Sequence, residues 1–248
     1  MGIDLDDILG LHNWRSEKFM PHQFITHIFM HANIMHIFFN MFMLWMFGRM
    51  LESVWGSKRF LIYYMLCGLG AAGLQMGVNT LELNAISNEV HAFAENPDMN
   101  GFIELTNKYG PALDDRNFPG GTEILNEVND FRVSHHTVEF SSEQEAQRAV
   151  YYVQQCLRGV TNIGMVGASG AVFGIFLGFG MLFPNTVMIM LFLPFPIKAK
   201  YMVAIMAAFE LYMGIQNNDS VAHFAHLGGA LVGFIIIKYW NSRGRTFY

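Results

Sequence analysis

Five long apolar segments dominate the pattern of hydrophobic and polar positions along the chain. Each approaches the roughly 20 residues that a helix needs to cross the hydrocarbon core of a bilayer. The segments are Ile28–Gly48, Phe60–Val78, Ile163–Phe183, Ala199–Ile215 and Val221–Ile237. The pattern therefore predicts an all-α, multi-pass membrane protein in which five spans are visible.

Composition supports this class of protein. The chain is 52% apolar and only 14% charged, whereas about a quarter of the residues in ordinary soluble domains are charged. Its two cysteines, Cys67 inside a predicted span and Cys156 in a polar stretch, are too few and too differently placed to indicate a disulfide framework or a zinc site.

A long polar stretch separates the second and third predicted spans. Residues 79–162 carry five Lys/Arg against thirteen Asp/Glu, which is a net charge of −8 in a chain whose total is −5. Prolines at positions 97, 111 and 119 divide the stretch into short elements. Ser142 and Glu145 form a capping-box pattern that predicts a helix toward Arg158. We therefore expect an acidic soluble insert.

Positive charges predict the orientation in the membrane. Only Arg15 and Lys18 lie in the short segments on one side, and eight basic residues lie on the other: Arg49, Lys58, Arg59, Lys198, Lys200, Lys238, Arg243 and Arg245. The side with more Lys and Arg is normally cytoplasmic. The insert is then extracytoplasmic.

These patterns divide the chain into five parts. They are an extracytoplasmic surface segment (1–26), the first and second visible spans (27–78), the insert (79–162), the third to fifth visible spans (163–240) and a cytoplasmic tail (241–248). The first part mixes Trp14, Phe19 and Met20 with polar residues, which suits a segment lying along the membrane surface.

Polar residues within the apolar spans are the candidates for chemistry, because burying them in a bilayer is costly. The run Gly167-Ala168-Ser169-Gly170 surrounds a serine with small residues, and His226 lies in the fifth span. Small-residue faces that let two helices approach closely are formed by Gly170 and Gly174 on one span and by Gly229 and Gly233 on the other. Docking of these faces would place Ser169 as a nucleophile beside His226 as its general base.

Acyl transfer also requires donors for the developing oxyanion. His36 and Asn40 are four residues apart and share one helical face, and the backbone N–H of Ser169 is a third candidate donor. We expect no acidic residue to orient His226, and so a Ser–His dyad rather than a triad. Glu210 in the fourth span stands apart from this group.

Other interpretations of the same residues remain open. Glycine faces commonly serve helix packing alone. Histidines in spans, here His27, His31, His36 and His223, also occur as structural hydrogen-bonding groups, as haem ligands or in proton paths. For His27, His31 and His223 we favour structural hydrogen bonds.

In combination and order, these motifs resemble the rhomboid intramembrane proteases. The resemblance is carried by the histidine spacing and HxxxN pair (His27, His31, His36, Asn40), the GxSG motif at Ser169, the run Ala225-His226-Leu227-Gly228-Gly229 with Gly233, and Leu51-Glu52 with Gly56. It implies a helical bundle with a Ser169–His226 dyad, an oxyanion site at His36 and Asn40, and no metal or cofactor. It also implies a location in the plasma (inner) membrane, with single-span transmembrane proteins in the lipid bilayer as substrates and no nucleic acid partner.

The chain departs from the family pattern in three places. The family core has six spans, and the five visible here correspond to its second to sixth. His22-Gln23 replaces the aromatic-basic dipeptide of the surface loop, and the insert replaces a short loop. The insert either helps to select substrates or is a tolerated surface insertion. A non-proteolytic rhomboid-like protein that binds transmembrane helices is the alternative function.

Overall fold

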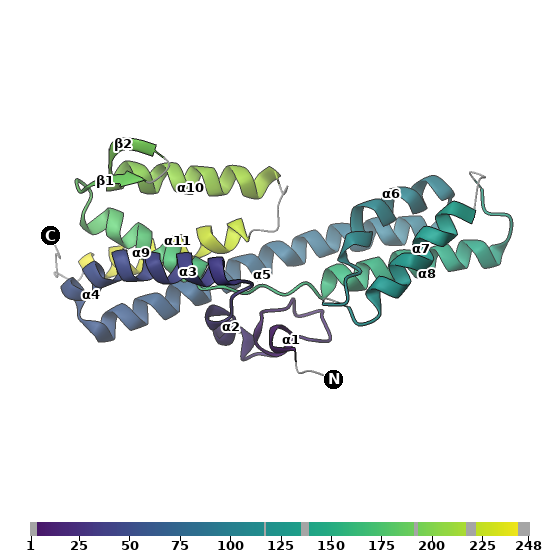
Figure 1. The fold of residues 1–248 in the computed structure, drawn as a ribbon, viewed down its shortest axis with the longest axis horizontal. Helices are drawn as coiled ribbons and strands as arrows, with labels where there is room; N and C mark the ends of the chain where they lie inside the picture. The colour runs from purple at the N-terminus through teal and green to yellow at the C-terminus, as the bar shows by residue number, and fades with distance from the viewer. Residues whose placement is uncertain (1–3, 117, 135–138, 191–192, 217–221, 243–248) are drawn as a thin grey trace. The chain divides into compact units, whose positions relative to one another are not determined.

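The computed structural model describes residues 4–116, 118–134, 139–190, 193–216 and 222–242, and it is mostly helical (Figure 1), which confirms the predicted all-α class. The elements are α1 (Leu5–Leu9), α2 (Gln23–Thr26), η1 (His27–Phe29), α3 (Ile34–Met43), η2 (Leu44–Gly48), α4 (Arg49–Trp55), α5 (Ser57–Glu95), α6 (Met99–Tyr109), η3 (Gly110–Ala112), α7 (Gly121–Ser134), α8 (Glu143–Thr161), α9 (Ser169–Leu182), β1 (Val187–Met190), β2 (Leu193–Lys198), α10 (Ala199–Gln216) and α11 (His223–Ser242).

Contacts between residues divide the chain into two compact units. The insert unit contains residues 4–8, 12–20 and 79–164, and the core unit contains residues 9–11, 21–78 and 165–242. Residues 1–26, which the sequence suggests as one surface segment, are therefore shared between the two units. In the insert unit, the Asn13 amide donates to Thr80 Oγ1 at 3.2 Å and the Ser16 hydroxyl to Asn162 Oδ1 at 2.7 Å.

Two helical segments among the described residues have the length and apolar composition to cross a membrane: Ile34–Trp55, made of α3, η2 and α4, and the helix α5. They overlap the first two predicted spans. The first begins at Ile34 rather than Ile28 because Met30 is extended and the Asn33 side chain caps the helix by accepting from the backbone N–H of His36. It ends at Gly56, whose φ of 78° favours glycine.

The second of these helices continues far beyond the apolar run. Helix α5 is 39 residues long and extends to Glu95, so residues 79–95 of the predicted insert belong to the same helix as the span. No proline or glycine interrupts the sequence between Val78 and Glu95, and Pro97 is the first breaker. The change from apolar to polar residues after Val78 therefore does not mark a helix end.

The insert unit has its own hydrophobic core, to which α6, α7 and α8 contribute Phe102, Phe131 and Tyr152. Helix α8 begins where the capping box predicts: Ser142 Oγ accepts from the Glu145 N–H at 3.2 Å, and Glu145 Oε2 accepts from the Ser141 N–H at 2.8 Å. Cys156 is fully buried in this core, and burial raises the pKa of its thiol to about 12. It is thus a neutral packing group at physiological pH.

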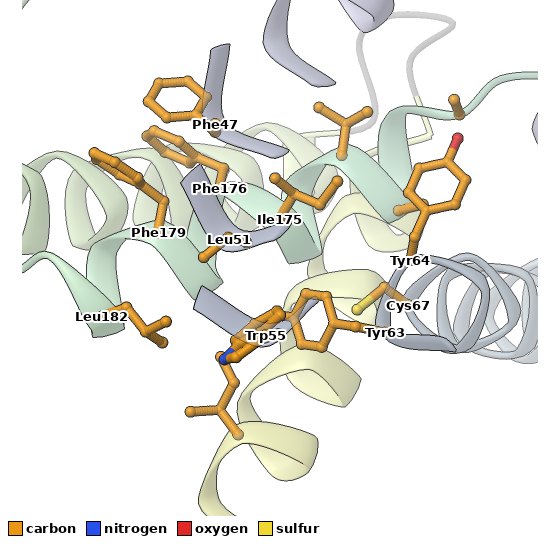
Figure 2. Close-up of a cluster of buried hydrophobic side chains, with 14 of the residues drawn as sticks. Phe47, Leu51, Trp55, Tyr63, Tyr64, Cys67, Ile175, Phe176, Phe179 and Leu182 are labelled. Atoms are coloured by element: carbon orange, nitrogen blue, oxygen red, sulfur yellow. The ribbon is translucent and has the colours of Figure 1, made fainter. Parts of the chain in front are cut away.

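The core unit is held together by aromatic and aliphatic side chains from α4, α5, α9 and η2 (Figure 2). Phe47 packs its ring against Phe176 and Phe179 at centroid distances of 5.3 and 4.8 Å. The buried hydroxyl of Tyr63 donates to the carbonyl oxygen of Gly174 at 2.6 Å, which ties α5 to the middle of α9. These contacts hold the helix that begins at Ser169.

Glycines allow the close approach of α9 and α11. A Cβ atom on Gly229 would overlap the backbone carbonyl of Gly170, and one on Gly174 would lie 2.6 Å from Cys67 Cβ and 3.0 Å from the carbonyl oxygen of Gly229. A Cβ on Gly233 would meet the Tyr63 hydroxyl. The small-residue faces of the two helices thus lie against each other and against α5.

The apolar stretch between α9 and α10 forms a short antiparallel hairpin of β1 and β2, in which Val187 pairs with Lys198. The sequence predicts a loop over 184–198 that does not cross the membrane, because Pro194 and Pro196 interrupt it. The hairpin connects α9 to α10, which then packs beside α11.

Candidate active site

Ser169 is the first residue of α9 and follows a glycine in an unusual conformation. Gly167 has a φ of +133°, which side chains rarely adopt, and its N–H donates to the carbonyl oxygen of His27 at 2.9 Å. A Cβ atom at Gly167 would lie 2.8 Å from both Cε1 and Nε2 of His36 and 3.6 Å from Ser169 Oγ. Glycine at this position therefore allows the imidazole of His36 to lie close to the serine.

His226 lies in the first turn of α11 and faces the serine directly. Its Nε2 is 2.8 Å from Ser169 Oγ, and its side chain is buried. The imidazole stacks on the ring of Phe173, one turn after Ser169, with centroids 4.6 Å apart and an interplanar angle of 2°. The backbone N–H of Ala225 donates to Gln75 Oε1 at 3.0 Å, which joins the start of α11 to α5. The structure thus brings together the two residues that sequence reasoning paired.

A carboxylate completes the cluster, and here the expectation from sequence is wrong. Glu210 Oε2 lies 2.8 Å from Nδ1 of His226 and 2.7 Å from Nδ1 of His223, so an acidic residue is well placed to orient His226. Glu210 precedes His226 by 16 residues, and only the packing of α10 against α11 brings the two together. One feature of the sequence points to this role: Glu210 lies inside an apolar span, where a carboxylate requires a hydrogen-bonding or charged partner.

His36 and Asn40 lie on α3 but make different contacts. Nδ1 of His36 accepts a long hydrogen bond, 3.4 Å, from the N–H of Ala32, so a neutral His36 carries its proton on Nε2, the nitrogen near Gly167. The Asn40 amide is buried and donates to the carbonyl oxygen of His36 at 2.9 Å. In this geometry the imidazole of His36 lies beside Gly167, two residues before Ser169. Asn40 supports the helical turn that carries His36.

His27, His31 and His223 take part in hydrogen bonds or ring contacts. His27 is buried and its Nδ1 is 2.8 Å from the carbonyl oxygen of Gln23. The ring of His31 lies edge-on to that of His36 at a centroid distance of 5.2 Å. His223 contacts Glu210 as described above. Hydrogen bonding to backbone and carboxylate groups accounts for His27 and His223 without a ligand.

Glu210, His223 and His226 could also provide three ligands to a metal ion. Their ligand atoms all lie within 4.8 Å of one another, and two imidazoles with one carboxylate are a donor set that zinc accepts. However, the two N···O separations of 2.7 and 2.8 Å are those of hydrogen bonds. The carboxylate is therefore satisfied by the imidazoles themselves.

Among the described residues, the structure is therefore a mostly helical protein with two apolar segments long enough to cross a membrane, and a serine, an imidazole and a carboxylate lie in one chain of contacts. A family model described as a rhomboid domain matches residues 18–85 and 147–242. The chain belongs to the rhomboid family. Neither the search of curated proteins nor the search of solved structures found a match. Residues 86–146, which lie within the insert unit, fall between the two matched stretches.

Proposed function

We propose that this rhomboid-family chain is an intramembrane serine endopeptidase that cleaves transmembrane proteins. The observation that carries the proposal is the 2.8 Å contact between Ser169 Oγ and His226 Nε2. Ser169 belongs to the GxSG motif and is the first residue of α9, and a serine paired with an imidazole can act as a nucleophile. Inactive members of the family also exist. A serine in hydrogen-bond contact with an imidazole favours an active enzyme over a non-proteolytic one.

The geometry supports a two-stage acyl transfer. Ser169 Oγ attacks the carbonyl carbon of the scissile peptide while its proton moves to His226 Nε2. The imidazolium then gives that proton to the leaving amine as the C–N bond breaks, which leaves an acyl enzyme on Ser169. Water repeats the sequence, with His226 as the base, and releases the second product.

Donors for the oxyanion are available beside the nucleophile. The first N–H groups of a helix have no intrahelical partner, which makes the N–H of Ser169 a suitable donor. Nε2–H of His36 is a second candidate because that nitrogen lies against Gly167. Asn40, which holds the backbone of His36, is the third candidate, as the HxxxN spacing suggests. We propose that these groups stabilise the tetrahedral intermediate.

The proposed substrates are single-span transmembrane proteins, cut within or near the bilayer. Ser169 and His226 lie at the starts of α9 and α11, whose apolar sequences suit membrane burial. We further propose that the protein resides in the plasma (inner) membrane, as the family resemblance implies. The insert would then lie on the extracytoplasmic side, as the distribution of Lys and Arg predicts.

The test is covalent labelling of the purified full-length protein by a fluorescent fluorophosphonate, which reacts with activated serines. We expect the wild-type protein to be labelled and Ser169→Ala not to be. Ser53→Ala is the matched control, because Ser53 is exposed on α4 and its hydroxyl donates to the carbonyl oxygen of Met50 in the same helix. Absence of labelling in folded wild-type protein would contradict the proposal and favour a non-proteolytic, helix-binding protein.

Substitution of the oxyanion candidates should slow the reaction without abolishing it. Removal of one oxyanion donor typically costs about 10²–10³ in turnover. We expect His36→Ala to lower the labelling rate constant by about this amount, and Asn40→Ala to lower it less, since Asn40 acts in part through the backbone of His36. Rate constants are measured from the time course of fluorescence incorporation. A wild-type rate in His36→Ala would exclude His36 from the oxyanion site.

A further inference from the structure

Glu210 is a buried carboxylate at the centre of the site, and its surroundings determine how it is satisfied. Only 6% of the residue is exposed. A buried carboxylate is costly unless it is hydrogen-bonded, and the cost is greater at membrane depth. A single oxygen, Oε2, receives both Nδ1 groups, that of His223 at 2.7 Å and that of His226 at 2.8 Å. The two imidazoles come from neighbouring turns of α11, so Glu210 joins α10 to the start of the helix that carries the general base.

We propose that Glu210 is the positioning residue of a Ser169–His226–Glu210 triad. This inference rests on the proposed function and adds a third member to the dyad that the sequence predicts. His226 connects the other two residues: its Nε2 is 2.8 Å from Ser169 Oγ, and its Nδ1 is 2.8 Å from Glu210 Oε2.

The carboxylate selects the form of His226 that can act as a base. An ionised carboxylate can only accept hydrogen bonds, so the nitrogen that faces it, Nδ1, carries the proton. In a neutral imidazole the other nitrogen, Nε2, is then an acceptor. Nε2 is the atom that faces Ser169 Oγ, so the serine hydroxyl donates to it and is ready to lose its proton. Without a fixed acceptor at Nδ1, the opposite tautomer would place an N–H against the serine and no base would be available.

The negative carboxylate also stabilises the positive charge that forms on His226 during the reaction. When Ser169 attacks, its proton moves to His226 and the imidazole becomes a cation. Glu210 lies in hydrogen-bond contact with that cation, in a buried site where opposite charges interact strongly. The proton stays on His226 until it passes to the leaving amine, and Glu210 does not take it.

The orientation of the imidazole is defined from two directions. Phe173 packs flat on one face of the ring, and Glu210 holds its edge through Nδ1. His223 in turn holds Glu210 through the same oxygen, with its own ring nearly perpendicular to that of His226. Removal of the charge at position 210 should therefore change the chemistry of His226 directly, whereas removal of His223 should affect His226 through the support of Glu210.

The experiment measures fluorophosphonate labelling of the full-length protein and separates the maximal rate constant, kinact, from the apparent affinity for the probe, KI. Glu210→Gln keeps the size of the side chain and removes its charge. We expect kinact to fall by up to about 10⁴, the loss seen when a triad carboxylate is replaced by its amide. KI should stay within about twofold, because Glu210 contacts His226 and not the serine. Glu210→Asp, which restores the charge one methylene further away, should recover part of kinact.

His223→Ala is the matched control, because it removes one donor to Glu210 and leaves the Glu210–His226 contact. We expect a smaller loss of kinact than in Glu210→Gln, with thermal unfolding of every variant measured alongside. A wild-type kinact in Glu210→Gln would overturn the triad and leave the proposed protease standing. Equal losses in Glu210→Asp and Glu210→Gln would also overturn it.

Two further outcomes would favour a different function of this cluster, either in a non-proteolytic protein or in a metal site. Absence of labelling in wild-type protein would overturn the proposed function and the triad with it. Metal analysis that finds one zinc per wild-type chain and none in Glu210→Gln would also overturn the triad, because the carboxylate would then hold an ion with His223 and His226. Metal-free protein with full labelling is the result that the triad requires.

Discussion

Replacement of Ser169 by alanine should remove the proposed proteolysis of a single-span membrane protein almost completely, with a loss of about 10⁶-fold, as in serine hydrolases that lose their nucleophile. The reason is that in the proposed mechanism the acyl enzyme forms on the Ser169 oxygen, which contacts His226 Nε2 at 2.8 Å. The measurement is the appearance of the shortened product when enzyme and tagged single-span proteins are reconstituted together in liposomes.

The effect of His226 provides a second, more discriminating measurement. His226→Ala should cost nearly as much as Ser169→Ala, and the double variant should be no worse than either single variant, because residues that act as a unit show non-additive losses. Ser53→Ala should cleave at the wild-type rate. Additive losses would show that Ser169 and His226 act independently, against the arrangement that we propose.

Replacement of Gly229 by alanine should have the largest effect on folding. The added Cβ would overlap the backbone carbonyl of Gly170, and a backbone atom cannot rotate away as a side chain can. Overpacking of this kind typically costs about 1–3 kcal/mol, and a backbone clash lies toward the upper end. We expect a lower midpoint of thermal unfolding in detergent and a loss of fluorophosphonate labelling, because separation of α9 from α11 also separates Ser169 from His226.

Gly73→Ala is the matched control for this substitution. Gly73 also lies within a helix, α5, but a Cβ atom there would meet nothing within 4 Å. Alanine is favoured over glycine in a helix by roughly 0.5–1 kcal/mol, so Gly73→Ala should unfold at the wild-type temperature or slightly above it. If Gly229→Ala were as stable as Gly73→Ala, the close contact of α9 and α11 would not be the feature that holds the site together.

Much of the site can be read from the sequence because its parts are local. The GxSG run covers four consecutive residues at the start of α9. His36 and Asn40 lie within one helix, as do the glycines three or four residues apart on α9 and on α11, so the 3.6-residue period gives the helical face on which they lie. The start of α8 at Ser142 follows from side-chain capping, which also acts over a few residues. Such features depend on neighbouring residues in the sequence and not on tertiary contacts.

Tertiary structure alone decided the features that depend on contacts between distant elements. Glu210 reaches His226 because α10 packs beside α11. The sequence around either residue gives no sign of this contact. Phe173 lies under the imidazole because α9 and α11 pack through glycines, and residues 12–20 join the insert unit through partners more than 60 positions away. Polar residues are conspicuous in apolar helices because their burial is costly, so the residues able to perform chemistry can be recognised from the sequence. Packing determined which of them meet.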